Sequence, residues 1–281
     1  MSTSTPTPPL ADFVAALNGM FDHYRRLCRD LSDEQLATQS LCPAWSARDV
    51  IAHVIGVEAV LDGWEPSLDA MPPFDRLAGY QTDAAALDRD GFTTMIDATI
   101  DSRLANLAAL GAEHAALLDM PSITPAGPAT YGRFLQIRLF DLWVHALDIA
   151  VPLGLTAAFP TGFAAERSVD EVQAAMGYIV GKKIGMTEGM SIVFHLTPTA
   201  TGTSTTAPGV ERDIAVAVEG RAHVVDAIAT PTTALTMDAQ TFVLLAAGRI
   251  DPQASIDAGT ATWTGDSEWG ERAARNLAYT R

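Results

Sequence analysis

The sequence predicts a helical bundle followed by a smaller α+β domain. Three observations support this class: the chain has 281 residues, enough for two domains; apolar residues recur at helical spacing up to about residue 155; and short alternating segments follow. We expect a disordered lead-in at 1–9, a four-helix bundle at 10–155 and an α+β domain at 156–281.

The first half contains the helical pattern. Apolar residues at 3.6-residue spacing recur in four segments: 10–31, 47–61, 82–118 and 131–151. Ser46 and Asp49 form a capping-box-like start of the second helix, and Pro152 ends the fourth. We expect a break near Gly91 in the third. A loop marked by Pro121, Pro125, Gly127 and Pro128 precedes the fourth.

The second half changes to strand-like alternation. Alternating apolar and polar residues predict strands in these segments: 192–196, 214–218, 221–225, 233–237 and 261–264. Glu219 and Gly220 are expected to form a hairpin turn. Helices are expected at about 162–180, 239–247 and 267–279. The Thr-, Pro- and Gly-rich segment 200–209 is expected to be a mobile loop.

Composition excludes several classes of protein. The net charge is −16, which repels phosphate backbones and argues against a nucleic-acid binder. Cys28 and Cys42 belong to no CxxC pair, so neither a thiolate zinc site nor a disulfide framework is indicated. We recognise no signal peptide and no apolar run long enough to span a membrane, and expect a soluble cytoplasmic protein.

The fourth helix carries a stripe of ionisable residues. Arg138, Asp141, His145 and Asp148 are spaced 3, 4 and 3 apart and share an arc of about 80°. One interpretation is that the stripe is the solvent-exposed face of the helix. The other is that it faces the bundle interior, where Asp141 and His145 could bind one cation.

A third ligand for such a cation would come from another helix. His53 lies in "DVIAHVIGVEAV", which offers little polar surface for an imidazole. It is either a hydrogen-bonded core histidine or a ligand. Together with Asp141 and His145, it would make a two-histidine, one-carboxylate set suited to Zn²⁺ or another divalent ion.

These motifs resemble those of a known family. "LCPAWSARDVIAHVIGVE" and "RLFDLWVHALDIA" are similar to segments of the mycothiol-dependent maleylpyruvate isomerase family, within the DinB-like metal-binding four-helix bundles. The family typically has a Cys-Pro-Gly-Trp-like turn, and its metal ligands correspond to His53, Asp141 and His145. Glu is more usual where this chain has Asp141. The C-terminal half resembles the sterol-carrier-like domain often found in this family.

The resemblance implies an enzyme that uses a divalent metal, with Zn²⁺ expected, and mycothiol or another low-molecular-weight thiol. A metal-activated thiolate would add to an electrophilic small molecule, giving cis-trans isomerisation or S-transfer. The alternatives are a small-molecule or lipid-binding protein with a structural metal, and a thiol-independent metal hydrolase. The sequence leaves the oligomeric state open.

Several residues have two possible roles. Arg138 would either bind a substrate carboxylate or pair with a neighbouring aspartate. Asp148 would either orient a histidine or form an ion pair. Asp49 could also orient a histidine, but we expect it to cap the start of its helix instead. Cys42 is expected to be buried, and His23 to lie at the boundary of the core. The tryptophans Trp45 and Trp143 are expected to be packing residues.

Overall fold

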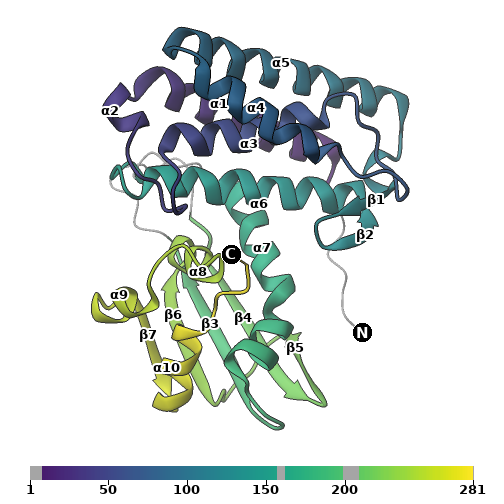
Figure 1. Ribbon diagram of the computed structural model, residues 1–281. Coiled ribbons are helices and arrows are strands. Elements are labelled where there is room, and N and C mark those ends of the chain that lie inside the picture. The colour runs from purple at the N-terminus through teal and green to yellow at the C-terminus, as the bar shows by residue number, and fades with distance from the viewer. Residues whose placement is uncertain (1–7, 157–161, 199–208, 281) are drawn as a thin grey trace. The chain divides into compact units, whose positions relative to one another are not determined.

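The computed structural model describes residues 8–156, 162–198 and 209–280, and the chain divides into two compact units after Leu155. Most of the expected lead-in at 1–9 and of the expected loop at 200–209 lies outside the described residues. The predicted class, a helical bundle followed by a smaller α+β domain, is confirmed (Figure 1).

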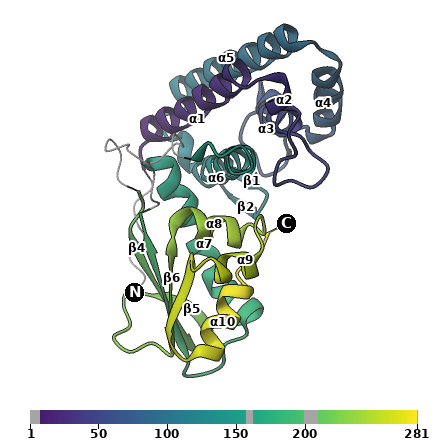
Figure 2. The same ribbon diagram turned by 90° about the vertical axis from the view of Figure 1, so that its left-hand side faces the viewer.

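Four long helices form the first unit: α1 (Leu10–Asp30), α3 (Ala47–Leu61), α5 (Arg89–Glu113) and α6 (Tyr131–Ala150). Each of α1 and α3 packs against both α5 and α6, which closes a bundle in the order α1–α5–α3–α6. Figure 2 shows α6 end-on beside the other helices. Shorter helical elements connect them: α2 (Asp33–Leu36), η1 (Phe74–Arg76), α4 (Leu77–Ala86) and η2 (Leu117–Asp119).

Two local expectations for this unit are wrong. The third helical region breaks at Leu87–Asp88 rather than near Gly91, because the Asp88 carboxylate caps α5 by accepting a hydrogen bond from the Gly91 N–H at 2.9 Å. The expected proline-marked loop also contains an antiparallel hairpin. Its strands are β1 (Pro121–Thr124) and β2 (Gly127–Thr130).

The second unit is built on a five-stranded sheet in the order β5-β4-β3-β6-β7. The strands are β3 (Ser191–Thr197), β4 (Arg212–Glu219), β5 (Arg221–Val225), β6 (Thr233–Asp238) and β7 (Ala261–Gly265). Among the described strands of this sheet, β3 and β6 pair in parallel and the other neighbouring strands are antiparallel. The predicted hairpin joins β4 to β5, and Gly220 there has a φ of +67°, a conformation that favours glycine.

Helices cover one side of this sheet. They are α7 (Phe163–Tyr178), the π-helical η4 (Ile179–Ile184), α8 (Ala239–Ala246), α9 (Pro252–Asp257) and α10 (Ser267–Arg275). Figure 2 shows α7, α8 and α10 gathered on the same side of the strands. The helix expected at 162–180 continues through the π-helical turn, and the last helix ends four residues earlier than expected.

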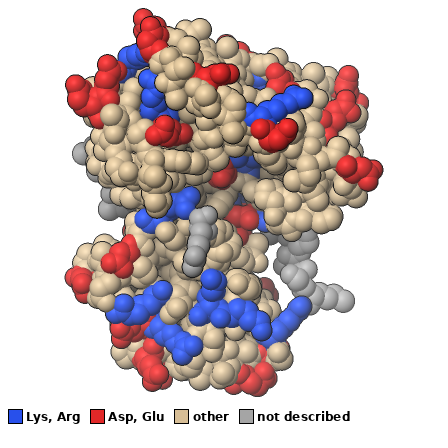
Figure 3. Space-filling model, viewed as in Figure 1, with Lys and Arg blue, Asp and Glu red and all other residues tan. Residues whose placement is uncertain are grey.

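Charged residues are distributed widely over the surface. On the face drawn in Figure 3, acidic and basic side chains are interspersed in the first unit, whereas in the second unit Lys and Arg side chains gather across the middle and acidic ones lie toward the edges. No helix within the described ranges is both long and apolar enough to cross a membrane.

Candidate metal centre

The turn before α3 is fixed by local hydrogen bonds. The Ser46 Oγ accepts from the Asp49 N–H at 3.2 Å, and the Asp49 Oδ2 accepts from the Ser46 N–H at 2.9 Å. This reciprocal pair is the predicted capping box, and the Asp49 carboxylate serves as its N3 partner. His53 follows in the same helix, one turn after Asp49.

The ionisable stripe of α6 faces inward. Fifteen of the 20 residues of this helix are buried, including Arg138, His145 and Asp148, of which Asp148 is 0% exposed. The Asp141 side chain is 32% exposed. The alternative interpretation of the stripe as a solvent-exposed face is therefore wrong. The physical reason is that the stripe packs against α3, whose Val54 carbonyl accepts a hydrogen bond from Arg138 at 3.3 Å.

His53, Asp141 and His145 lie together across the α3–α6 contact. The ring centroids of His53 and His145 are 5.2 Å apart, and the His145 Nε2 lies 3.6 Å from the Asp141 Oδ1. Two imidazoles and one carboxylate from two helices are therefore neighbours, although among the described residues their ligand atoms do not all lie within 4.8 Å of one another. Imidazole and carboxylate are donor types that zinc accepts.

The electrostatics of the three groups suit a cation. Burial, reinforced by the nearby His145, lowers the pKa of His53 to about 4, so its imidazole is neutral and able to donate a lone pair at neutral pH. Burial alone would raise the pKa of Asp141, but the positive charge of Arg138 and its hydrogen bond to the carboxylate hold this pKa below its usual value. The carboxylate is therefore ionised.

Asp148 orients His145 from the other side of the ring. Its Oδ2 lies 2.9 Å from the His145 Nδ1 and accepts from the Cys42 Sγ at 3.0 Å. Since a carboxylate accepts, we assign the ring proton to Nδ1, which leaves Nε2 unprotonated and directed toward Asp141.

Cys42, His145 and Asp148 also form a group of three potential ligands whose atoms lie within 4.8 Å of one another. Ligand atoms around a tetrahedral zinc ion are separated by about 3.3 Å or more, given bond lengths of about 2.0–2.3 Å. The separations of 2.9 and 3.0 Å in this group are shorter and match hydrogen bonds. Cys42 is buried as expected, and its Sγ lies 3.7 Å from the His145 Nδ1.

Trp45 contacts both histidines. Its ring centroid lies 4.6 Å from that of His53 and 6.5 Å from that of His145. The preceding Ala44 has a φ of +64°, at the position where the family motif has glycine. Sequence reasoning expected only a packing residue here, and no local signal indicated that Trp45 would lie over His53.

Arg138 forms ion pairs with two carboxylates of the protein itself. Its Nη1 donates to the Asp141 Oδ2 at 2.5 Å, and its Nε donates to the Glu58 Oε1 at 3.0 Å. Of the two roles left open by the sequence, ion pairing is the one present in this arrangement. Glu58 was not singled out from the sequence, although a Glu in a nearly all-apolar helix is a signal that could have identified it.

Two titratable residues of α1, Tyr24 and His23, are buried as well. The Tyr24 hydroxyl donates to the Leu142 carbonyl at 2.7 Å, and burial, with the charges of Asp141 and Asp148, raises the Tyr24 pKa well above its usual value. His23 is buried rather than at the boundary of the core, and burial lowers its pKa to about 4. The expectation for His23 is wrong because α1 packs between α5 and α6.

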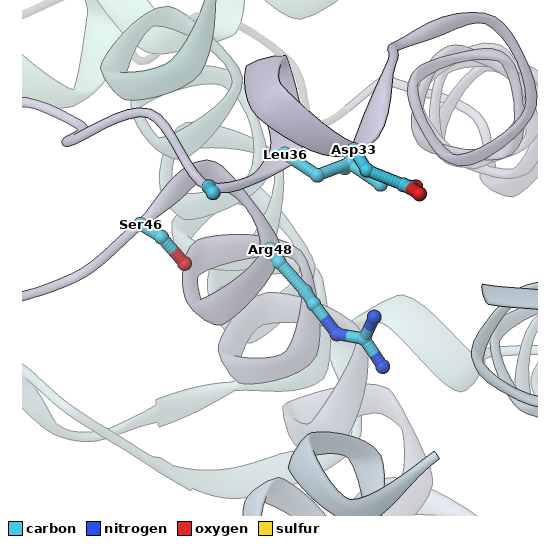
Figure 4. A pocket seen from close by; sticks show the side chains of 5 residues that line it. Asp33, Leu36, Ser46 and Arg48 are labelled. Carbon is cyan, nitrogen blue, oxygen red and sulfur yellow. The ribbon is translucent and has the colours of Figure 1, made fainter. Parts of the chain in front are cut away.

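A cavity of 290 Å³ lies between α2 and the start of α3 (Figure 4). It is lined by Asp33, Leu36, Ala37, Ser46 and Arg48. The Arg48 guanidinium donates to the carbonyls of Ala84 and Leu87, so it is occupied in holding α3 to the end of α4. None of the three predicted metal ligands lines this cavity.

Comparisons with known proteins agree with the predicted resemblance. Residues 18–150 match the model of the mycothiol maleylpyruvate isomerase N-terminal domain. Crystal structures of the mycothiol-dependent maleylpyruvate isomerase and of a histidine-to-alanine mutant superpose with TM-scores of 0.56 and 0.55, at 18% and 17% identity. Each match covers 92% of this chain and 93% of that chain. At this identity, the likeness shows the fold. No curated protein matches the chain.

Proposed function

The first unit belongs to the mycothiol maleylpyruvate isomerase N-terminal domain family, and from that premise we propose that this protein is a metal- and thiol-dependent enzyme. Its substrates would be a small thiol, mycothiol or a similar compound, and an electrophilic small molecule. The reaction would be cis-trans isomerisation or S-transfer. The proposal requires a compartment that supplies reduced thiol, which is the cytoplasm.

One observation carries the proposal. The rings of His53 on α3 and His145 on α6 lie edge-to-face with their centroids 5.2 Å apart, and the Asp141 Oδ1 lies 3.6 Å from the His145 Nε2. We propose these three as the ligands. Two imidazoles and a carboxylate with an open position favour Zn²⁺. Such an ion, when bound, would lower the pKa of a coordinated thiol and supply a thiolate at neutral pH.

The remaining residues prepare this site. Asp148 holds the proton on the His145 Nδ1, so that Nε2 is the free donor. Trp45 packs against the ring of His53, with the ring centroids 4.6 Å apart. Arg138 is assigned to the Asp141 carboxylate rather than to a substrate carboxylate, because its guanidinium already donates to Asp141 and Glu58.

The test begins with metal binding. Zn²⁺ content and affinity would be measured for the wild type, His53→Ala and Asp141→Ala, with His195→Ala as the control, since His195 is an exposed histidine of the second unit paired with Asp213. We expect about one ion in the wild type and the control, and loss of tight binding in the two site variants, with all four folded by circular dichroism.

Turnover is the second step. Mycothiol and simpler thiols would be supplied with maleylpyruvate and with other electrophiles. Thiol-dependent conversion that disappears in His53→Ala supports the proposal. Failure of the reconstituted wild type to bind metal contradicts it. Metal-dependent hydrolysis without thiol would indicate the hydrolase, and co-purifying lipid with no turnover would indicate the binding protein.

A further inference from the structure

A chain of charged side chains crosses the interior of the bundle. Arg103 of α5, Glu58 of α3 and Arg138 of α6 have side chains only 1%, 1% and 7% exposed. The Arg103 Nε donates to the Glu58 Oε2 at 3.0 Å, and the Arg138 Nη2 donates to the Glu58 Oε1 at 2.8 Å. Three helices thus each contribute one charge to a single buried cluster.

Further hydrogen bonds hold both ends of this cluster. At the far end, which is the Arg103 end, Arg103 donates from Nη1 to the Asn106 Oδ1 at 2.7 Å and from Nη2 to the Tyr131 hydroxyl at 3.0 Å. At the near end, which is the Arg138 end beside the candidate metal centre, the Arg138 Nη1 donates to the Asp141 Oδ2. Glu58 itself has both carboxylate oxygens occupied by guanidinium groups, so its orientation is determined from two sides.

Stability alone is a poor reason for such a cluster. Moving charges out of water costs several kcal/mol per ion, and well-packed apolar side chains of similar volume are often as stabilising as a buried ion pair. The geometry of the near end offers another reason. Arg138 binds only the Asp141 Oδ2, while the Oδ1 lies on the side of the His145 Nε2, 3.6 Å away.

The charges of the cluster also balance. Arg103 and Arg138 contribute two positive charges, and Glu58 and Asp141 contribute two negative charges, so the sum is zero. A divalent cation near Asp141 therefore meets no net positive charge from the two arginines. Loss of the Glu58 charge would leave one uncompensated positive charge beside the site, and Arg138 would then have Asp141 as its only carboxylate partner.

We propose that Arg103, Glu58 and Arg138 form a positioning relay that holds the Asp141 carboxylate with its Oδ1 directed at the metal site. The inference rests on the proposed function, because it assigns the relay a role toward a metal ligand. Arg103, Glu58 and Arg138 are positioning residues: they act through Asp141 and contact neither His53 nor His145.

The test compares metal affinity with stability. Zn²⁺ affinity would be measured by competition with a chromophoric chelator for the wild type, Glu58→Gln and Arg103→Met. Arg25→Met is the matched control, because Arg25 joins α1 to α5 through Asp97 at 3.1 Å and belongs to the same bundle but not to the relay. We expect Glu58→Gln and Arg103→Met to bind Zn²⁺ about 10- to 100-fold more weakly, as for other residues that orient ligands, and Arg25→Met to match the wild type.

A spectroscopic readout separates positioning from general destabilisation. The visible spectrum of the Co²⁺-loaded protein at saturating metal should change in the relay variants and stay unchanged in Arg25→Met. If Glu58→Gln does not fold, Tyr131→Phe perturbs the far end without removing a charge, and should weaken binding by a few-fold with the same spectral change.

The two proposals fail in different ways. A wild type that binds no metal contradicts the proposed function. A wild type that binds Zn²⁺, with relay variants that bind it within twofold and keep the Co²⁺ spectrum, overturns the relay alone. Equal weakening in the relay variants and in Arg25→Met also overturns it, because that result indicates a purely structural role.

Discussion

His145 and Asp148, one turn apart on α6, share a hydrogen bond of 2.9 Å between Nδ1 and Oδ2. This contact determines which ring nitrogen is available. With the proton on Nδ1, the lone pair of His145 is on Nε2, the atom that lies 3.6 Å from Asp141. A buried carboxylate thereby sets the direction in which an imidazole can donate.

Replacing Asp148 should weaken metal binding without unfolding the bundle. In Asp148→Asn the charge is lost and the tautomer of His145 is no longer enforced, so we expect Zn²⁺ affinity to fall about 10- to 100-fold. Asp213→Asn is the control, since Asp213 also contacts a histidine Nδ1, that of His195, at 2.6 Å on the surface of the second unit. Equal affinity in Asp148→Asn and the wild type would show that this hydrogen bond does not prepare the ligand.

Cys42 should be dispensable as a metal ligand. Its thiol donates to the Asp148 Oδ2 and lies 3.7 Å from the His145 Nδ1, which is not the ring nitrogen proposed to bind the metal. We expect Cys42→Ser and Cys42→Ala to keep Zn²⁺ affinity within a few-fold, with Cys42→Ala losing about 1–2 kcal/mol of stability through its missing hydrogen bond. A sulfur-to-metal charge-transfer band in the thiol-free Co²⁺ protein, lost in Cys42→Ser, would contradict this.

His23 should make the bundle less stable as the pH falls. Burial lowers its pKa from 6.5 to about 4, so between these values the unfolded chain binds a proton that the folded chain does not. Stability is therefore lost as pH falls through this window, by about 2 kcal/mol between pH 7.5 and 5.0. His23→Gln should remove that part of the dependence.

Urea unfolding at the two pH values measures this effect. His195→Gln, at an exposed position, serves as the control and should retain the dependence of the wild type. A wild type and His23→Gln variant with the same loss of stability on acidification would show that His23 is not responsible.

Ala44→Gly should stabilise the first unit. Ala44 has a φ of +64°, where a Cβ costs about 1–2 kcal/mol, partly offset by the greater freedom of glycine in the unfolded chain. We expect a net gain of about 0.5–1 kcal/mol in denaturant unfolding. The reciprocal change, Gly63→Ala at a φ of +71° with open space for its Cβ, should destabilise by a similar amount. A loss of stability in Ala44→Gly would refute the strain argument.

Short-range information was sufficient for much of the fold. The capping box of Ser46 and Asp49 is formed by residues three apart, and the helical period of α1, α3 and α6 is visible within each segment, so both could be predicted. The same holds for the hairpin at Gly220. The break was expected near Gly91, but α5 begins just after Asp88, because the Asp88 carboxylate caps its first turn by accepting from the Gly91 N–H.

The sequence by itself determined that Arg138, Asp141, His145 and Asp148 share one face of a helix, because a 3.6-residue period is a property of the helix alone. Only the tertiary structure decided that this face is buried, because burial depends on which helix packs against it. The packing of α3 on α6 brought His53 and Glu58 to the stripe, and the turn at Ala44 brought Trp45 over His53. The contacts of Glu58 with Arg138 and of His53 with His145 join residues 80 and 92 positions apart, a separation over which no local hydrogen bond or helical period carries information.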